Sequence, residues 1–424
     1  MTQTSLAQAA TSPWALSLPE ARRRSREQDA DLRAWVCLSD GDIEQKGETG
    51  GGSLAGVAFG VKDVIDVAGL PTRSGATATN DMSTNDMPQP WDAACVAQLR
   101  AAGAVPIGKT VTAEFAYMSP GPTRNPHRLD HTPGGSSSGS AAAVAAGHVE
   151  LALGTQTGGS IIRPAAFCGV IGFKPTFGRI HRGGMRVLCD SLDTIGWFTR
   201  TLDQSIATAQ ALLGPDASVA IGTHGTRAPR VAVLPSRALA TLSPAADAAL
   251  VQGVAKLRAL GAEIVEPSCD DEQAELLAVH GAIMHAEFAR GMLPIFGARG
   301  AGLRTPDITT ATREGIEKGL AISPADYAKH RQARERLARI WEDRFSAFDV
   351  ILAPSAPSEA PAGLASTGSS IFNRIWSLLG WPCVHLPTGT TPLGLPVGVQ
   401  LVATPARDLP LLAWARWLGL AESD

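Results

Sequence analysis

The chain has 424 residues and a formal net charge of −3, with 44% hydrophobic and 5% aromatic residues. A slightly acidic chain with few aromatic side chains lacks the basic surface and stacking platforms that nucleic-acid binding needs. No apolar run approaches the ~20 residues of a membrane span. The N-terminal region is polar, carries the run Arg22–Arg24 and has no apolar stretch typical of a signal peptide. We therefore expect a soluble, cytoplasmic protein that binds neither nucleic acid nor membrane.

The predicted elements alternate between helix and strand along the chain. The segment up to about Cys37 predicts one or two surface helices, and residues 44–53 a polar, glycine-rich loop. Strands are predicted at 105–108, 149–153, 230–234, 263–266 and 397–401. Helices are predicted at 93–102, 140–146, 245–260, 271–293 and 324–348, and a Leu/Trp-rich helix ends the chain. Strands alternating with helices predict an α/β fold, with helices on both faces of a sheet.

Metal and cofactor chemistry finds little support in the sequence. The cysteines are Cys37, Cys95, Cys168, Cys189, Cys269 and Cys383, with no C-x-x-C pair, which argues against a zinc ribbon or a disulfide framework. His127 and His131 have the spacing of helical metal ligands, but Pro126 and Pro133 flank them and favour a loop. We expect reduced thiols, no metal and no cofactor.

Two glycine-packed turns present serines, at residues 133–140 (PGGSSSGS) and 154–165 (GTQTGGSIIRPA). Glycine turns let backbone N–H groups approach a ligand, and a serine hydroxyl there can attack it or relay a proton. Neither turn contains a histidine to act as the base. Lys62, in the upstream segment Val61–Asp63, is a candidate for that role.

These motifs resemble the amidase signature family, whose members hydrolyse amide bonds with a Ser–Ser–Lys triad. The resemblance runs from about residue 56 to about 402 and includes the segments 56–63, 103–110, 168–176 and 394–400. It implies a single domain over 1–424, with N-terminal helices in about 1–50, a signature core at about 56–215 and a remainder that completes it. The fold implied is a central mixed β-sheet covered by helices on both faces. Within the family, the motif at residues 154–165 most resembles that of bacterial malonamidases.

The resemblance assigns Ser160 as the nucleophile. This serine follows two glycines and precedes a run, Ile161–Cys168, that is expected to open a helix. The backbone N–H groups of Thr157, Gly158, Gly159 and Ser160 would converge on a developing oxyanion, helped by the helix N-terminus. The alternative is an ordinary helix entry with Ser160 as its N-cap.

Ser136 and Lys62 complete the implied triad. Ser136 stands 24 residues before Ser160, the family's spacing, in which the first serine after Gly-Gly follows a cis peptide and relays protons. Apolar neighbours such as Phe59 and Val64 predict that Lys62 is desolvated, which lowers a lysine pKa and creates a base. The alternatives are a flexible Gly/Ser linker around Ser136 and an exposed strand-edge position for Lys62.

Arg163 is the expected substrate-binding residue. It stands three positions after Ser160, as in malonamidase-like members, where the arginine binds the substrate's free carboxylate. A guanidinium suits this purpose because it donates to a carboxylate in a bidentate manner. The alternative is a structural arginine that pairs with a loop. Malonamidase relatives add a glutamine where this chain has Met284 or His285.

The activity implied is hydrolysis of a small-molecule carboxylic amide to an acid and ammonia or an amine, through an acyl-enzyme. An acid amide of malonamate type is one candidate substrate. Two alternatives stay open: a carbamate- or urea-type amidase of the same family, and a non-catalytic assembly subunit with the same scaffold. A homodimer is also left open.

Two other motif matches lack the structural context they need. Residues 103–110 (GAVPIGKT) match the Walker A pattern, but a helix is predicted before Gly103 and the strand falls inside the supposed loop. Gly135-x-Ser137-x-Gly139 matches a nucleophile elbow, but residues 125–130 before it predict a loop rather than a strand. Neither match indicates function.

Overall fold

A computed structural model of the chain describes residues 12–39, 52–76, 87–214, 228–297 and 308–419. Its strands are β1 (Trp35–Leu38), β2 (Ala58–Lys62), β3 (Val105–Thr110), β4 (Leu151–Gln156), β5 (Ile171–Lys174), β6 (Thr194–Thr199), β7 (Arg230–Val233), β8 (Glu263–Val265), β9 (Val350–Pro354), β10 (Cys383–Thr390) and β11 (Pro396–Val402). They form one 11-stranded sheet in the order β1-β3-β2-β4-β6-β5-β10-β11-β9-β7-β8. β2 pairs in parallel with β3 and β4, whereas β4 pairs antiparallel with β6, so the predicted mixed sheet is confirmed.

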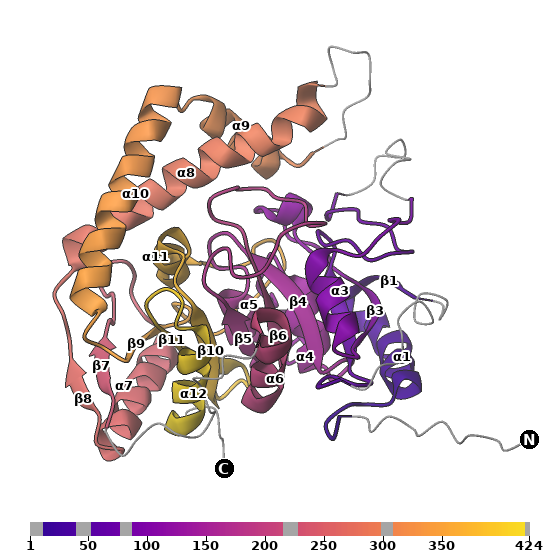
Figure 1. Ribbon diagram of the computed structural model, residues 1–424, viewed down its shortest axis with the longest axis horizontal. Helices are drawn as coiled ribbons and strands as arrows, with labels where there is room; N and C mark the ends of the chain where they lie inside the picture. The colour runs from indigo at the N-terminus through magenta and orange to yellow at the C-terminus, as the bar shows by residue number, and fades with distance from the viewer. Residues whose placement is uncertain (1–11, 40–51, 77–86, 215–227, 298–307, 420–424) are drawn as a thin grey trace, which may run out of the picture.

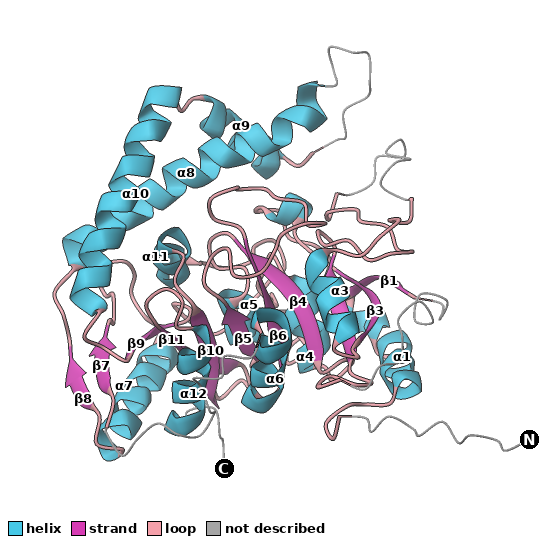
Figure 2. Ribbon diagram, in the orientation of Figure 1, coloured by secondary structure: helices cyan, strands magenta, loops and turns pink. Residues whose placement is uncertain are grey.

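Helices cover both faces of this sheet (Figure 1, Figure 2). They are α1 (Leu18–Glu27), α2 (Asp29–Leu32), α3 (Ala94–Ala101), α4 (Ser138–Ala145), α5 (Ile162–Cys168), α6 (Leu202–Leu213), α7 (Pro244–Ala259), α8 (Asp270–Gly297), α9 (Thr310–Leu320), α10 (Pro324–Phe345), α11 (Ile371–Leu379) and α12 (Asp408–Leu418), with a short 3₁₀ turn at Glu114–Ala116. The helices α3, α6, α7 and α12 share one core cluster with the sheet. On the other face, α4 packs over β2 and β4, α5 packs over β5, β10 and β11, and α8, α10 and α11 share a core cluster with β7 and β9. The α/β fold predicted from the alternation of elements is confirmed.

Most predicted elements lie within a few residues of the observed ones, and the differences have a physical reason. β3 and β4 each continue past the predicted end into polar residues, because their side chains find partners. Thr110 Oγ1 lies 2.7 Å from Ser140 Oγ, and the Gln156 side chain accepts from the N–H of Ile161. The segment at Trp35 is a strand rather than the end of a helix, since it pairs antiparallel with β3. The predicted loop at 44–53 lies largely outside the described residues.

The two misleading motif matches are explained by their surroundings. The supposed Walker lysine, Lys109, is fully buried, with Nζ 3.1 Å from Asp63 Oδ1 and 2.8 Å from Thr72 Oγ1. Ser137, the supposed elbow serine, donates to the carbonyl oxygen of Thr155 at 3.2 Å. Both side chains therefore brace the sheet, and the fold provides neither a phosphate loop nor a nucleophile elbow there.

The structure also bears on the predicted state of the cysteines and on membrane-spanning helices. All six cysteines are free, as predicted. Among the described helices, none combines the length and apolar character needed to cross a membrane. The expectation of a single domain over 1–424 stays a prediction.

Candidate active site

Lys62, Ser136 and Ser160 come together at the ends of two parallel strands. Lys62 is the last residue of β2, and Ser160 lies in the turn that joins β4 to α5. Ser136 lies in the loop before α4, and the Gly135–Ser136 peptide bond is cis, as the family resemblance implies. Because β2 and β4 run parallel, both chain segments leave the sheet at the same edge. The sheet thus gathers three side chains that are 98 residues apart in sequence at most.

Lys62 is fully buried and its Nζ has two hydroxyl partners. It donates to Ser136 Oγ and to Thr155 Oγ1, both at 2.7 Å. Burial lowers the pKa of Lys62 to about 7; Asp193 raises it and the nearby Arg163 lowers it further. An amine with such a pKa is largely neutral just above pH 7, and its lone pair can then accept a proton from Ser136.

The two serines differ in access to solvent. Ser136 is 1% exposed, whereas Ser160 is 8% exposed and lines a cleft of about 520 Å³, including the part open to solvent. Among the described residues, no hydrogen bond joins the two hydroxyls, but such contacts commonly tighten only when substrate binds. Ser160 is therefore the serine that a substrate can reach, whereas the buried Ser136 contacts Lys62.

The carbonyl oxygens of the turn before Ser160 all accept hydrogen bonds. His280 Nε2 donates to the carbonyl oxygen of Thr157 at 3.0 Å, and Ser377 Oγ donates to that of Gly158 at 2.8 Å. The carbonyl of Gly159 accepts from the Arg163 N–H at 2.9 Å. Burial lowers the pKa of His280 to about 4, so its ring stays neutral with Nε2 as the donor.

The N–H groups of the same turn remain available. Within the described part of the chain, those of Thr157, Gly158, Gly159 and Ser160 have no acceptor. The next two N–H groups, of Ile161 and Ile162, are both taken by Gln156 Oε1, at 2.9 and 3.0 Å. Four adjacent donors of this kind can stabilise the negative oxygen of a tetrahedral intermediate.

Gly159 is required by the packing of this turn. A Cβ at this position would stand 2.6 Å from Asn373 Oδ1 and 2.6 Å from Ser370 Cβ, both on or beside α11. Contacts this short would force the turn to move. Gly159 thus lets the main chain approach α11 closely, and its own N–H has no acceptor among the described residues.

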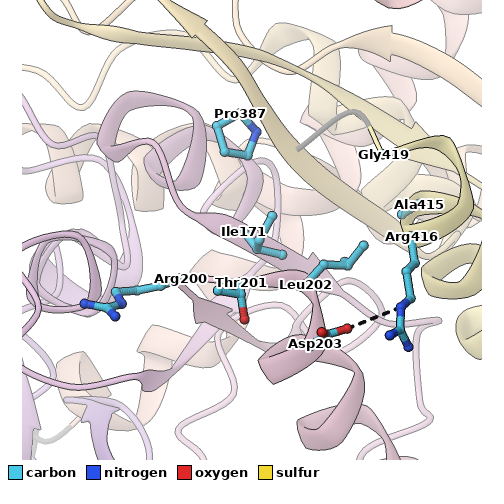
Figure 3. A pocket seen from close by; sticks show the side chains of 9 residues that line it. All are labelled: Ile171, Arg200, Thr201, Leu202, Asp203, Pro387, Ala415, Arg416 and Gly419. Atoms are coloured by element: carbon cyan, nitrogen blue, oxygen red, sulfur yellow. Dashed lines mark ion pairs between the residues drawn. The ribbon is translucent and has the colours of Figure 1, made fainter. Parts of the chain in front are cut away.

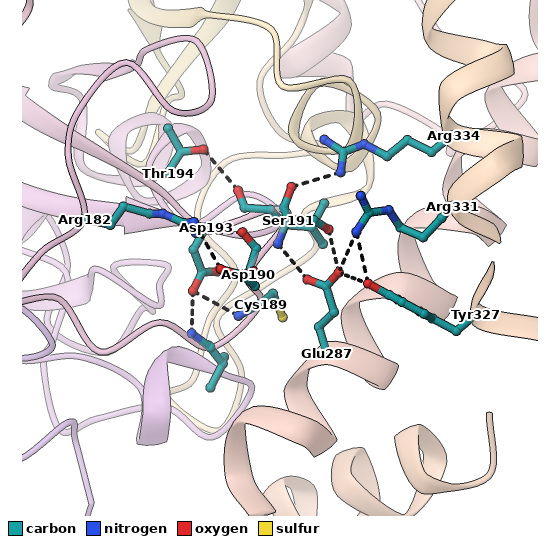
Figure 4. A network of polar contacts seen from close by, with 12 residues as sticks. Arg182, Cys189, Asp190, Ser191, Asp193, Thr194, Glu287, Tyr327, Arg331 and Arg334 are labelled. Atoms are coloured by element: carbon teal, nitrogen blue, oxygen red, sulfur yellow. Dashed lines mark hydrogen bonds and ion pairs between the residues drawn. The ribbon is translucent and has the colours of Figure 1, made fainter. Parts of the chain in front are cut away.

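Asp193 holds the other side of the turn through Thr157. The loop that carries Asp193 is connected to the outer helices through Ser191 (Figure 4). The Asp193 carboxylate accepts from Thr157 Oγ1 at 2.5 Å and from the N–H groups of Leu188 and Cys189 at 2.6 and 3.1 Å. Two residues before it, Ser191 donates from its N–H and its Oγ to Glu287 of α8, at 2.8 and 2.6 Å.

Helix α10 joins the same network. Arg334 donates to the carbonyl oxygen of Ser191 at 3.0 Å, and Tyr327 donates its hydroxyl to Glu287 Oε1 at 2.6 Å. The helices α8 and α10 therefore fix the loop that carries Asp193, and Asp193 fixes the turn. Sequence reasoning identified none of these residues, because they stand in a loop and in two helices without a recognisable motif.

Arg163 is nearly buried, at 5% exposure, and most of its donors are occupied. Nε and Nη2 donate to the carbonyl oxygen of Gly135, at 3.1 and 2.5 Å, and Nη1 donates to that of Gly368. Three of its five N–H groups therefore tie the loop of Ser136 to the loop before α11. Carboxylate binding by Arg163 stays a prediction. The hydrogen bonds to Gly135 and Gly368 favour the alternative, in which Arg163 holds a loop.

The two residues aligned with the missing glutamine differ in their surroundings. Met284 lines the cleft with Ser160, while His285 has its ring 6.4 Å from that of Tyr117. His127 and His131, the rejected metal pair, lie away from these contacts: His127 Nε2 is 2.9 Å from the Cys168 carbonyl oxygen, and His131 Nδ1 is 2.8 Å from Asp130.

Another pocket, of about 820 Å³ including the part open to solvent, lies beside α6 and α12 (Figure 3). It contains an ion pair between Arg416 and Asp203, with 3.4 Å between nitrogen and oxygen. Its lining includes no member of the Lys62, Ser136 and Ser160 set. The cleft at Ser160 therefore stays the predicted place of the chemistry that the motifs suggest.

Comparison with known proteins finds relatives over most of the chain. The amidase family model matches residues 31–412. A subunit of the glutamyl-tRNA(Gln) amidotransferase from Synechococcus sp. (strain RCC307) is 33% identical over 407 residues, covering 85% of this chain and 82% of the relative. The corresponding protein from Akkermansia muciniphila is 32% identical over 415 residues, covering 86% and 87%.

Solved structures give the same result. A crystal structure described as an amidase superposes with a TM-score of 0.82 at 30% identity, covering 96% of this chain and 95% of the other. A 6-aminohexanoate cyclic dimer hydrolase complexed with substrate superposes with a TM-score of 0.82 at 26% identity, covering 95% and 92%. Fold and relatives together define a hydrolase that acts on amide C–N bonds. The chain belongs to the amidase signature family.

Proposed function

We propose that the chain hydrolyses small carboxylic amides, with Ser160 as nucleophile, Ser136 as proton relay and Lys62 as base. The observation that carries this proposal is the 2.7 Å contact between the buried Lys62 Nζ and Ser136 Oγ, with the pKa of Lys62 lowered to about 7. A buried amine that is neutral near pH 7 and touches a hydroxyl is poised to take its proton.

The reaction runs in two halves. Ser160 Oγ attacks the amide carbonyl while its proton passes to Ser136 and the proton of Ser136 passes to Lys62. The N–H groups of Thr157, Gly158, Gly159 and Ser160 stabilise the oxyanion. The C–N bond then breaks as the relay returns a proton to the leaving nitrogen, and ammonia departs. Water attacks the resulting ester by the same relay and releases the acid.

An ammonia-release assay on the purified chain tests this function. The panel should contain primary amides of mono- and dicarboxylic acids, an N-alkyl amide, a carbamate and a urea, which separates the amide proposal from the carbamate- and urea-type alternatives. We expect ammonia from the primary amides, and a loss of at least ~10⁴-fold in Ser160→Ala, because the nucleophile is gone. Equal rates in the wild type and in folded Ser160→Ala would contradict the proposal.

A second candidate comes from the names of the relatives. Several of them are amidotransferase subunits, which fits the alternative of a protein that works beside a partner. Glutamine belongs in the assay panel for this reason. Ammonia release from glutamine alone among the amides would favour a role as the amide-cleaving component of an amidotransferase.

A further inference from the structure

We propose that Arg374 binds a carboxylate of the substrate and thereby selects small amides of dicarboxylic acids. This inference rests on the proposed hydrolysis at Ser160 and names the substrate class of that same site. It assigns to Arg374 the contact that the sequence had suggested for Arg163.

Arg374 belongs to the cleft of Ser160. It stands in the first turn of α11 and lines this cleft together with Tyr117, Gly158 and Ser160. A Cβ on Gly158 would lie 3.7 Å from Arg374 Cγ, so the stem of the arginine packs against the N–H-bearing turn. A group held by the guanidinium is therefore held beside the turn that faces the reacting carbonyl.

The positive charge of Arg374 is uncompensated. Its one hydrogen bond among the described residues runs from Nε to Ser370 Oγ, at 3.2 Å, and no carboxylate of the described chain lies within ion-pair distance of it. None of the described residues lining the cleft is acidic. Arg374 retains the four N–H groups of its two terminal nitrogens, which is the fork that binds a carboxylate in a bidentate manner.

In the protein without a ligand, the surroundings of Arg374 destabilise its positive charge. The side chain is partly buried, and burial lowers its pKa. Its charge also opposes that of Arg163, whose pKa is lowered to about 9 by burial first and by Arg374 second. A cation in the first turn of a helix meets the positive end of the helix dipole. An arginine at this position therefore does not stabilise the fold. A bound anion would be stabilised by the charges of Arg374 and Arg163 and by the helix dipole.

The rest of the cleft limits the substrate. Its small volume and the apolar side chains of Leu188 and Met284 suit a short carbon chain between two polar ends. One end is the amide carbonyl at Ser160 and the other is the carboxylate at Arg374. Monoamides of malonic, succinic and glutaric acid have this form.

Binding and turnover are measured separately, so that the two proposals can fail separately. Calorimetry on the wild-type chain uses malonate, succinate and glutarate, with the matching uncharged diamides as controls. We expect at least one dicarboxylate to bind, and Arg374→Met to weaken it by about ten- to a hundredfold, while the binding of the diamide changes little. Arg374→Lys should recover part of the affinity, because an ammonium keeps the charge without the planar fork.

The kinetic arm compares succinamate with the uncharged butyramide. Arg374→Met should lower kcat/KM for succinamate by a similar factor and leave butyramide within about threefold. Arg237→Met is the matched control, because Arg237 is exposed and pairs with Asp247 outside the cleft. Thermal melting establishes that each variant is folded.

The outcomes are distinct. If the wild type binds none of the three dicarboxylates, or if folded Arg374→Met binds them as the wild type does, the assignment of Arg374 is overturned. Equal losses on succinamate and butyramide overturn it as well. If no amide is hydrolysed but dicarboxylate binding depends on Arg374, the site assignment stands and the proposed hydrolysis fails.

Discussion

Two parts of this molecule contribute different kinds of residue to the candidate active site. The part from β2 to β6 carries Lys62, Ser136 and Ser160 in contiguous motifs, on strands and turns of the sheet. The part made of α8, α10, α11 and their loops contributes His280, Ser377 and Arg374, whose segments have no motif. The first part holds the groups proposed to react. The second fastens the turn of Ser160 and supplies Arg374, a charge in its cleft that no carboxylate of the described residues pairs with. The groups proposed for reactivity and the group proposed for selectivity are thus separated along the chain, while Ser160 and Arg374 line the same cleft.

Among the variants that test the contact between the two parts, the largest effect is expected at Gly159. In Gly159→Ala the new methyl group collides with Ser370 and Asn373 of the second part, so the turn must move and its N–H donors lose their alignment. We expect kcat to fall by about 10²- to 10³-fold, the loss typical of one oxyanion donor. Gly389→Ala is the control, because nothing lies within 4 Å of its Cβ position. Near-normal turnover in Gly159→Ala would show that the close contact does not matter.

A smaller effect is expected at Arg163, which bridges the two parts. Arg163→Met removes the hydrogen bonds to the carbonyl oxygens of Gly135 and Gly368 and so frees the loop of Ser136. Charged and uncharged amides should lose kcat/KM alike, by roughly ten- to a hundredfold. Steady-state kinetics on succinamate and butyramide measure this. A loss confined to succinamate would restore the role of carboxylate binder predicted from the sequence and would count against Arg374.

The smallest effect is expected from loss of the hydrogen bond between Ser377 and the carbonyl oxygen of Gly158. Ser377→Ala removes the donor to the Gly158 carbonyl oxygen and the acceptor for Gln156 Nε2. A hydrogen bond of this kind contributes about 1 kcal/mol, so kcat should fall about fivefold. Ser205→Ala is matched to it, since that buried serine accepts from Trp197 on the other face of the sheet. Equal kinetic effects of the two variants would mean that loss of stability, rather than loosening of the turn, explains the change.

Sequence reasoning proposed the reacting groups but not the residues that surround them. Lys62, Ser136 and Ser160 stand beside glycines and apolar residues in short, ordered motifs, which is why their roles could be proposed. Thr155 stands inside one such motif, yet its contact with Lys62 Nζ depends on the parallel pairing of β2 and β4. His280 and Arg374 reach the site only through the packing of α8 and α11, which no local pattern encodes.

The fold shows the same limit. Long amphipathic helices such as α7 and α10 were predicted nearly to their ends, because their apolar spacing is periodic. The strands β5, β6 and β10 were not predicted. β5 and β6 are buried throughout and β10 through its first half, so the alternation of polar and apolar residues that marks a half-exposed strand is weak or missing. The charged face of α10 is exposed at Arg336 and Arg339, but Arg334 turns inward to Ser191.

The central claim is that neutral Lys62 is the base, and the pH dependence of kcat/KM on an uncharged amide tests it most directly. Because the pKa of Lys62 is lowered to about 7, the amine is neutral above that pH and protonated below it. We therefore predict that the rate falls about tenfold per pH unit below pH ~7 and levels off above it. Folded Lys62→Met should lose at least about 10³-fold and the pH-dependent limb with it. A rate that is constant from pH ~5 to ~9 with chemistry limiting, or a limb that survives in Lys62→Met, would contradict the account.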